Sequence, residues 1–106
     1  MKKILCVIPS RIGSTRLPRK PLLPINGKPM VQLVYENALR CAWLQDVIVA
    51  TDNHEIMQVI QNINGKVMMT DSNLLTGSDR VAAVAKEFSD VDIVINLQGE
   101  IGRAHV

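Results

Sequence analysis

The sequence has few aromatic residues, few cysteines and no long apolar run, and each shortage excludes a class of protein. Aromatic side chains make up 3% of the 106 residues, which argues against the stacking platforms that bind single-stranded nucleic acid. Two cysteines, Cys6 and Cys41, cannot form a disulfide framework, so we expect a reduced, cytoplasmic setting in which both are small core residues. A membrane span needs about 18 apolar residues. The short runs here exclude an integral membrane protein, and Ile4–Ile8 is too short for a secretory signal.

Acidic residues are missing from the first third of the chain. Residues 1–35 contain seven basic residues and no acid, whereas residues 36–106 contain five basic and ten acidic residues. The chain therefore carries a charge of +7 followed by −5, which the net charge of +2 conceals. Such a concentration of positive charge indicates either an anionic ligand or a solvated basic face.

Apolar runs alternate with segments of helical periodicity. Helical spacing occurs in Met30–Ala42, in His54–Ile63 (with Asn64-Gly65 as its stop) and in Ser78–Phe88 (with Ser78 as candidate N-cap). The apolar runs are Ile4–Ile8, Val47–Ala50, Val67–Met69 and Ile93–Leu97; all but Val67–Met69 are rich in Val and Ile, as in strands buried on both faces. This β-α-β-α-β-α-β order predicts an α/β fold with a parallel sheet and flanking helices.

That architecture predicts where a ligand binds. Open parallel sheets bind ligands beyond the carboxyl ends of their strands, near the switch in strand order. If the order is 3-2-1-4, the segments that follow the first and fourth strands face each other across that switch.

The segment Pro9–Pro29 is unusually long for a connection between a strand and its helix. It has about 20 residues where about two to six are usual. Five prolines brace it, and it carries five basic side chains without an opposing acid. We therefore expect a phosphate-binding segment. It contains neither a Walker A sequence nor the GxGxxG fingerprint, so Asp52, after the second strand, has either a ribose-binding role or a capping or turn role.

The sequence PSRIGSTRLPRKPLLPINGKPMV, at residues 9–31, resembles the N-terminal signature of nucleotidyltransferases that activate acidic sugars with CTP. Within that group it is most similar to the CMP-Kdo synthetase (3-deoxy-manno-octulosonate cytidylyltransferase) family. Further similarities are VIVATD at 47–52, MTDSNLLTGSDRVAAVA at 69–85 and INLQG at 95–99. The resemblance implies a Rossmann-like nucleotidyltransferase fold, truncated here after the fourth strand.

The resemblance also implies roles for individual residues. Arg11 and Lys20 would be catalytic, holding the triphosphate and the departing pyrophosphate. Ser78, Arg80 and Gln98 would lie near the base or ribose. The full implied nucleotide-binding set is Pro9, Ser10, Arg11, Arg16, Lys20, Ser78, Arg80 and Gln98. The Mg²⁺-binding Asp of the family corresponds to Glu100, which departs from the family pattern.

Some of these residues also have purely structural interpretations. Ser78 also fits the helix N-cap, Arg80 can pair with Asp79 or Asp71, and Gln98 can satisfy loop backbone groups.

The implied reaction joins CTP and Kdo to give CMP-Kdo and pyrophosphate for lipopolysaccharide synthesis, with Mg²⁺. The implied partners are CTP and an acidic sugar, with no nucleic acid or membrane, and the full-length parent is expected to be a homodimer. Residues 1–100 are interpreted as the N-terminal, nucleotide-binding part of the domain, and the chain alone is expected to be inactive. Residues 101–106 are interpreted as a non-native tail, because the family pattern breaks after Gly99. Two alternatives are CMP transfer to a related acidic or amino sugar, and a nucleotide-binding remnant without turnover.

Overall fold

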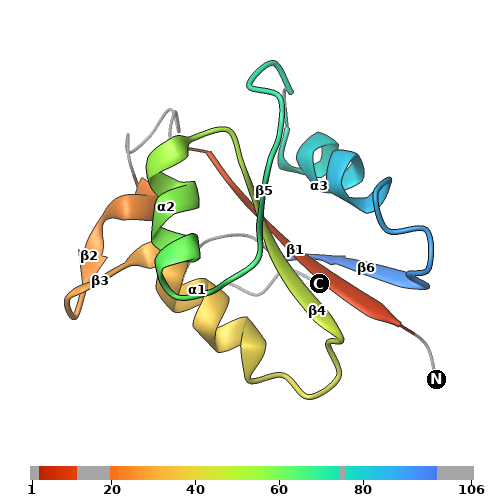
Figure 1. Cartoon of the computed structure of the whole chain (residues 1–106), viewed down its shortest axis with the longest axis horizontal. Coiled ribbons are helices and arrows are strands. Elements are labelled where there is room, and N and C mark those ends of the chain that lie inside the picture. Colours follow the sequence, from red (N-terminus) through yellow and green to blue (C-terminus); the bar gives the residue numbers. More distant parts are fainter. Residues whose placement is uncertain (1–2, 12–19, 75, 98–106) are drawn as a thin grey trace.

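The computed structural model describes residues 3–11, 20–74 and 76–97. Its main sheet has four parallel strands in the order β5-β4-β1-β6, which is the expected 3-2-1-4 order (Figure 1). The strands are β1 (Ile4–Ser10), β4 (Asp46–Thr51), β5 (Val67–Met69) and β6 (Ile93–Asn96). β1 and β6 lie side by side in the sheet although about 90 residues of chain separate their starts. The strand order therefore reverses at β1, which lies between β4 and β6.

Helices cover both faces of this sheet, as the alternation of elements predicts. The helices α1 (Met30–Leu39) and α2 (His54–Asn62) pack on one face, and α3 (Gly77–Ala85) packs on the other (Figure 1). Successive residues of β1 point to opposite faces: Cys6 and Ile8 join the α1/α2 core, whereas Leu5 and Val7 join the α3 core. The parallel α/β fold is therefore confirmed.

The end of α2 follows the expected stop signal. Asn64 adopts a φ of 59°, the left-handed conformation that ends many helices. Gly65 is required for space rather than for φ. A Cβ added there would lie 2.6 Å from Ile60 Cγ2 and 2.8 Å from Tyr35 Cε2, distances that a side chain could not accept.

The start of α3 differs from the expectation. Thr76, not Ser78, is the N-cap: its side chain accepts a hydrogen bond from the backbone N–H of Asp79 at 3.0 Å, and the Asp79 carboxylate accepts one from the backbone N–H of Thr76 at 3.2 Å. This reciprocal capping box explains why the N-cap lies two residues earlier than predicted. Ser78 is consequently an exposed residue of the first turn, without a capping role.

Within the described part of the Pro9–Pro29 segment, the structure shows regular elements that were not predicted. They are a 3-10 turn, η1 (Lys20–Leu22), and a short hairpin formed by β2 (Pro24–Ile25) and β3 (Lys28–Pro29). Asn26 (φ 53°) and Gly27 (φ 82°) form its two-residue turn, which requires positive φ at both positions. Leu22 and Ile25 pack against the α1/α2 core and anchor the segment.

Burial departs from a fully covered core at two places. β6 lies at the edge of the sheet, and Ile93 and Val94 are 40% and 39% exposed. The cysteines are not both core residues, because Cys6 is buried but Cys41 is exposed. Burial, with a smaller contribution from Cys41, raises the pKa of Cys6 to about 11, so this thiol stays protonated and unreactive.

None of the helices in the described ranges is both long enough and apolar enough to cross a bilayer.

Candidate functional site at the carboxyl ends of the strands

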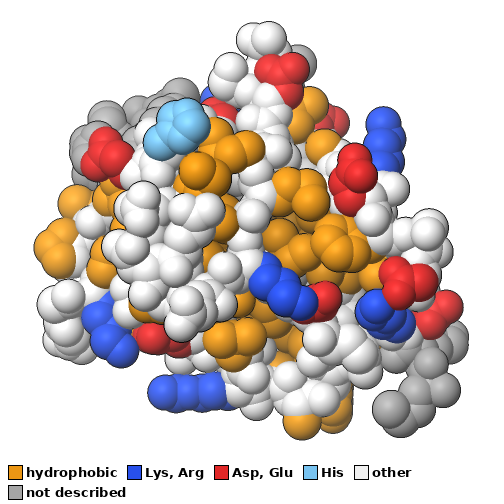
Figure 2. All heavy atoms as spheres, viewed as in Figure 1, with side chains coloured by type: hydrophobic (Ala, Val, Ile, Leu, Met, Phe, Trp, Pro, Cys, Tyr) orange, Lys and Arg blue, Asp and Glu red, His pale blue; other side chains and the backbone are white. Residues whose placement is uncertain are grey.

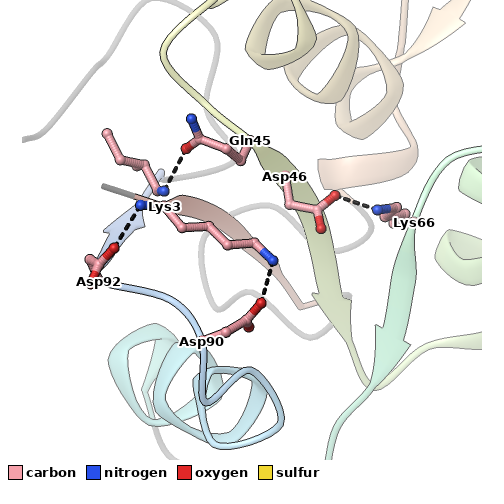
Figure 3. A network of polar contacts seen from close by, with 7 residues as sticks. Lys3, Gln45, Asp46, Lys66, Asp90 and Asp92 are labelled. Atoms are coloured by element: carbon pink, nitrogen blue, oxygen red, sulfur yellow. Dashed lines mark hydrogen bonds and ion pairs between the residues drawn. The ribbon is translucent and has the colours of Figure 1, made fainter. Parts of the chain in front are cut away.

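The amino ends of the strands are closed by a satisfied polar network. The Lys3 amide donates to Asp92 Oδ2 at 2.7 Å, and the Ile4 amide donates to Gln45 Oε1 at 2.6 Å (Figure 3). Two ion pairs, Lys3–Asp90 and Lys66–Asp46, lie beside them. The hydrogen bond from Lys3 holds the pKa of Asp90 below its usual range, and the same bond raises the pKa of Lys3. These groups use their polar atoms on each other and leave little for a ligand.

The carboxyl ends differ, because buried polar atoms there lack hydrogen-bond partners within the described residues. Such atoms within the described residues are Ser10 Oγ, Asp52 Oδ1, Asn96 Oδ1 and the Nε and Nη2 of Arg80. Ser10 ends β1, Asp52 follows β4, and Asn96 ends β6. Buried polar groups are normally hydrogen-bonded, so a group of exceptions at one edge of a sheet indicates a place for a polar ligand. It is also the edge at which the fold predicts ligand binding.

The structure brings several of the predicted site residues to this edge. Pro9 and Ser10 are the last residues of β1, and Arg11 follows them with an exposed side chain. The first turn of α3 packs against β1, since a Cβ on Gly77 would lie 3.4 Å from Pro9 Cγ. Ser78 is exposed on that turn. Residues far apart in sequence therefore meet where the resemblance places a nucleotide.

Other predicted site residues cannot be located. Arg16, Gln98 and Glu100 lie outside the described residues. Lys20 begins η1, but its side chain is likewise not described. Their roles remain expectations.

Arg80 occupies an environment that was not predicted. Its side chain, from α3, is fully buried; Nη1 donates to Thr70 Oγ1 and, at 3.3 Å, to the carbonyl oxygen of Asp71. Its Nη2 lies 3.7 Å from Asp52 Oδ2. Of the two predicted partners, Asp71 contributes only its backbone, and Asp79 is engaged in the capping box. The sequence does not indicate the contact between Asp52 and Arg80, because 28 residues separate the two.

Asp52 does not cap α2. Asn53 is the N-cap, and its Oδ1 accepts from the backbone N–H groups of Glu55 and Ile56 at 2.9 and 3.1 Å. Thr51 Oγ1 accepts from the Asn53 amide at 3.1 Å and so fixes this turn. The capping interpretation of Asp52 is therefore wrong.

Two basic residues of the first third, Lys3 and Lys28, are engaged in ion pairs. Lys3 pairs with Asp90, and Lys28 donates to Glu36 Oε1 at 3.1 Å, a hydrogen bond that lowers the pKa of Glu36. On the face drawn in Figure 2, the coloured basic and acidic side chains are interspersed. The charges of these two lysines, of the seven basic residues, are therefore paired within the chain.

A small cavity lies away from this edge, at the amino end of β4. Its volume is about 100 Å³, and its lining includes Tyr35, Cys41, Asp46 and Lys66. Sites for small molecules usually measure about 300–1,000 Å³, so this cavity does not accommodate a nucleotide.

The fit of Mg²⁺ rests on few protein ligands. In residues 3–11, 20–74 and 76–97, no group of three or more His, Cys, Asp or Glu side chains could hold a metal ion by itself. Mg²⁺ in nucleotide sites is commonly held by one or two carboxylates together with substrate phosphates. A single carboxylate beside a bound triphosphate is therefore sufficient, and the donor set of such a site does not require a cluster.

Fold and site together define an α/β protein with a polar-ligand site at the carboxyl edge of its parallel sheet. A family model described as Cytidylyltransferase matches residues 5–102, and the chain belongs to this family.

Individual relatives give a finer likeness. The chain is 50% identical over 97 residues to the 3-deoxy-manno-octulosonate cytidylyltransferase of Acaryochloris marina, covering 92% of this chain and 40% of that protein. It is 48% identical over 96 residues to the 8-amino-3,8-dideoxy-manno-octulosonate cytidylyltransferase of Shewanella halifaxensis, covering 89% of this chain and 39% of that protein.

A solved structure of CMP:2-keto-3-deoxy-manno-octonic acid synthetase complexed with CTP matches with a TM-score of 0.89 at 48% identity. The match covers 93% of this chain and 41% of that chain. The chain thus spans about two fifths of the length of these relatives. The predicted family is confirmed.

Proposed function

We propose that this chain supplies the CTP-binding part of an enzyme that joins CTP and Kdo to give CMP-Kdo and pyrophosphate. The observation that carries the proposal is a set of buried polar atoms at the carboxyl edge that have no hydrogen-bond partner among the described residues. This set includes Ser10 Oγ and lies at the end of β1, where Pro9 and Arg11 also lie. The similarity to a CTP-bound synthetase over 93% of this chain supports the identity of the nucleotide.

The proposed chemistry depends on position and charge. The oxygen of the anomeric hydroxyl attacks the α-phosphorus and releases its proton to solvent. The bond between the α-phosphorus and the oxygen that bridges the α- and β-phosphates breaks, and pyrophosphate leaves with that oxygen. Arg11 and Lys20, with Arg16, would bind the phosphates and stabilise the charge that accumulates on the leaving group. Ser78, Arg80 and Gln98 would lie on the base side, where the first turn of α3 meets Pro9. Glu100 would hold Mg²⁺, which when bound neutralises phosphate charge and lowers the pKa of the attacking hydroxyl.

The remaining parts of the proposal concern the context of the reaction. We propose a cytoplasmic, homodimeric full-length enzyme that feeds lipopolysaccharide synthesis, with residues 1–100 as its nucleotide-binding part and residues 101–106 as a non-native tail. Neither nucleic acid nor a membrane is a proposed partner.

An amino sugar is a second candidate acceptor. The 8-amino-3,8-dideoxy-manno-octulosonate enzyme of Shewanella halifaxensis is 48% identical to this chain, nearly as similar as the Kdo enzyme of Acaryochloris marina at 50%. Identity over this part of the sequence therefore does not separate the two sugars, and both belong in the assay.

The test uses a carrier enzyme, defined as the Acaryochloris marina relative with its matching segment replaced by residues 1–99 of this chain. We expect the carrier to release pyrophosphate from CTP in the presence of Kdo and Mg²⁺. We also expect CTP to be bound at least about tenfold more tightly than ATP, because a site reached by Ser78 and Gln98 would suit a small pyrimidine. Competition titrations measure that ratio. Equal binding of ATP, or a carrier without turnover, contradicts the proposal.

A further inference from the structure

The Asp52 carboxylate faces α3 and not the α2 turn. Along β4, Ile48 and Ala50 belong to the α3 core, and side chains two residues apart share a face. Asp52 continues that series one position beyond the strand, which ends at Thr51. Its carboxylate accordingly lies 3.7 Å from Arg80 Nη2, with a side chain only 15% exposed.

Arg80 needs this carboxylate. A guanidinium cannot lose its proton at ordinary pH, and burying an unpaired charge carries a large desolvation penalty. The Arg80 side chain is 0% exposed, and the two acceptors bonded to its Nη1, from Thr70 and Asp71, are both neutral. Asp52 is thus the negative charge that the structure places beside it.

The cluster of Asp52, Thr70 and Arg80 joins three elements at the nucleotide edge. Asp52 follows β4, Thr70 follows β5, and Arg80 stands one turn into α3. The Thr70 amide also donates to the Thr51 carbonyl oxygen at 2.8 Å, which ties the ends of the two strands together. Arg80 therefore ties α3 to the ends of β4 and β5, at a position two residues after Ser78.

The cluster also has unused bonding capacity. Arg80 Nε and Nη2 and Asp52 Oδ1 have no hydrogen-bond partner within the described ranges. Nε and one Nη form the edge of a guanidinium that binds a carboxylate through two parallel hydrogen bonds. The Arg80 guanidinium and the Asp52 carboxylate therefore have the atoms for such a bidentate pair. Nη2 of Arg80 lies 3.7 Å from Oδ2 of Asp52.

We propose that Asp52 is a positioning residue for nucleotide binding: by orienting Arg80 it sets the first turn of α3 at the base side of the site. This inference rests on the proposed function. It differs from the ribose-binding role that the position of Asp52 after the second strand also suggests, and that difference can be measured.

The experiment compares Asp52→Asn with the unmodified carrier enzyme in its affinity for CTP and for 2′-deoxy-CTP. Positioning through Arg80 predicts that Kd rises about tenfold for both nucleotides, because the altered element acts on the base side. A direct bond from Asp52 to the ribose 2′-hydroxyl predicts a rise for CTP alone. That second pattern, or an unchanged Kd, would overturn the proposal.

A double-mutant cycle tests whether Asp52 acts through Arg80. We expect Asp52→Asn to weaken CTP binding far less in an Arg80→Gln background than in the unmodified carrier, since the group that it orients has gone. Asp52→Glu, which keeps the charge and has a longer reach, should restore most of the affinity. Equal effects in the two backgrounds would mean that Asp52 acts independently of Arg80.

The matched control is Asp46→Asn. It makes the same chemical change and removes an ion pair, with Lys66, at the opposite end of the same strand. We expect its Kd for CTP to be unchanged. Measurements below the melting temperature of every variant separate positioning from loss of folded protein. If the unmodified carrier fails to bind CTP, the proposed function is wrong and this inference fails with it. If the unmodified carrier binds CTP and Asp52→Asn leaves the Kd unchanged, as the control does, only this inference is wrong.

Discussion

Lys20→Met is expected to lower kcat of the carrier enzyme about 100-fold while leaving its thermal stability nearly unchanged. The physical reason is that the contact strengthens as negative charge builds on the departing pyrophosphate, so its loss appears in the rate of the chemical step. Removal of one preorganised donor to a developing oxyanion typically lowers kcat by about 10²–10³. Initial rates of pyrophosphate release at saturating CTP give the measurement.

Lys28→Met is the control for that experiment. Lys28 lies in the same proline-rich segment, eight residues later, and pairs with Glu36 on α1 through an ion pair in which the lysine side chain is half exposed. Exposed ion pairs contribute about 0–1 kcal/mol to stability, and this one has no proposed part in catalysis. Its kcat should stay within about twofold of the unmodified enzyme. An unchanged kcat in Lys20→Met would remove Lys20 from the catalytic set.

The second large effect concerns the 106-residue chain by itself. We expect it to release no pyrophosphate above background from CTP, Kdo and Mg²⁺, whereas the carrier turns over. The chain spans only about 40% of the relatives with this activity, and the acceptor sugar needs contacts of its own beside the nucleotide site. The measurement compares the rates of pyrophosphate release at equal protein concentration, with the Acaryochloris marina enzyme as reference. Turnover near that of the reference would show that the other three fifths is dispensable.

The main fold could be predicted from the sequence because its signals are local and repeated. Continuous Val/Ile runs and three amphipathic periods identify the parallel sheet and its helices, and the chirality of crossovers limits the strand order. The hairpin at Asn26-Gly27 is also predictable, because this dipeptide is a strong turn signal. The interpretation of residues 9–29 as one long connection does not include it. The α3 cap was misplaced because Thr76 and Ser78 are both good caps, and only the capping box with Asp79 distinguishes them.

The site was predicted in part, for a different reason. Pro9 and Ser10 could be placed because they follow the first apolar run, and the edge of the sheet is a property of the fold. The pairing of Asp52 with Arg80 could not, since 28 residues separate them and only the packing of α3 on the sheet brings them together. Cys41 is exposed because α1 ends at Leu39, which leaves this residue beyond the helix that packs on the sheet.

The central claim is that CTP binds at the carboxyl edge of the sheet, and a nuclear magnetic resonance titration of the ¹⁵N-labelled chain with CTP tests it most directly. The account predicts shifts in the amide signals of Ser10, Arg11, Asp52, Thr70 and Ser78. The signals of Gln45, Lys66 and Asp92, at the closed amino ends, should stay in place and serve as the internal control. Shifts centred on those amino-end residues, or equal shifts at the carboxyl edge with ATP in place of CTP, would contradict the account.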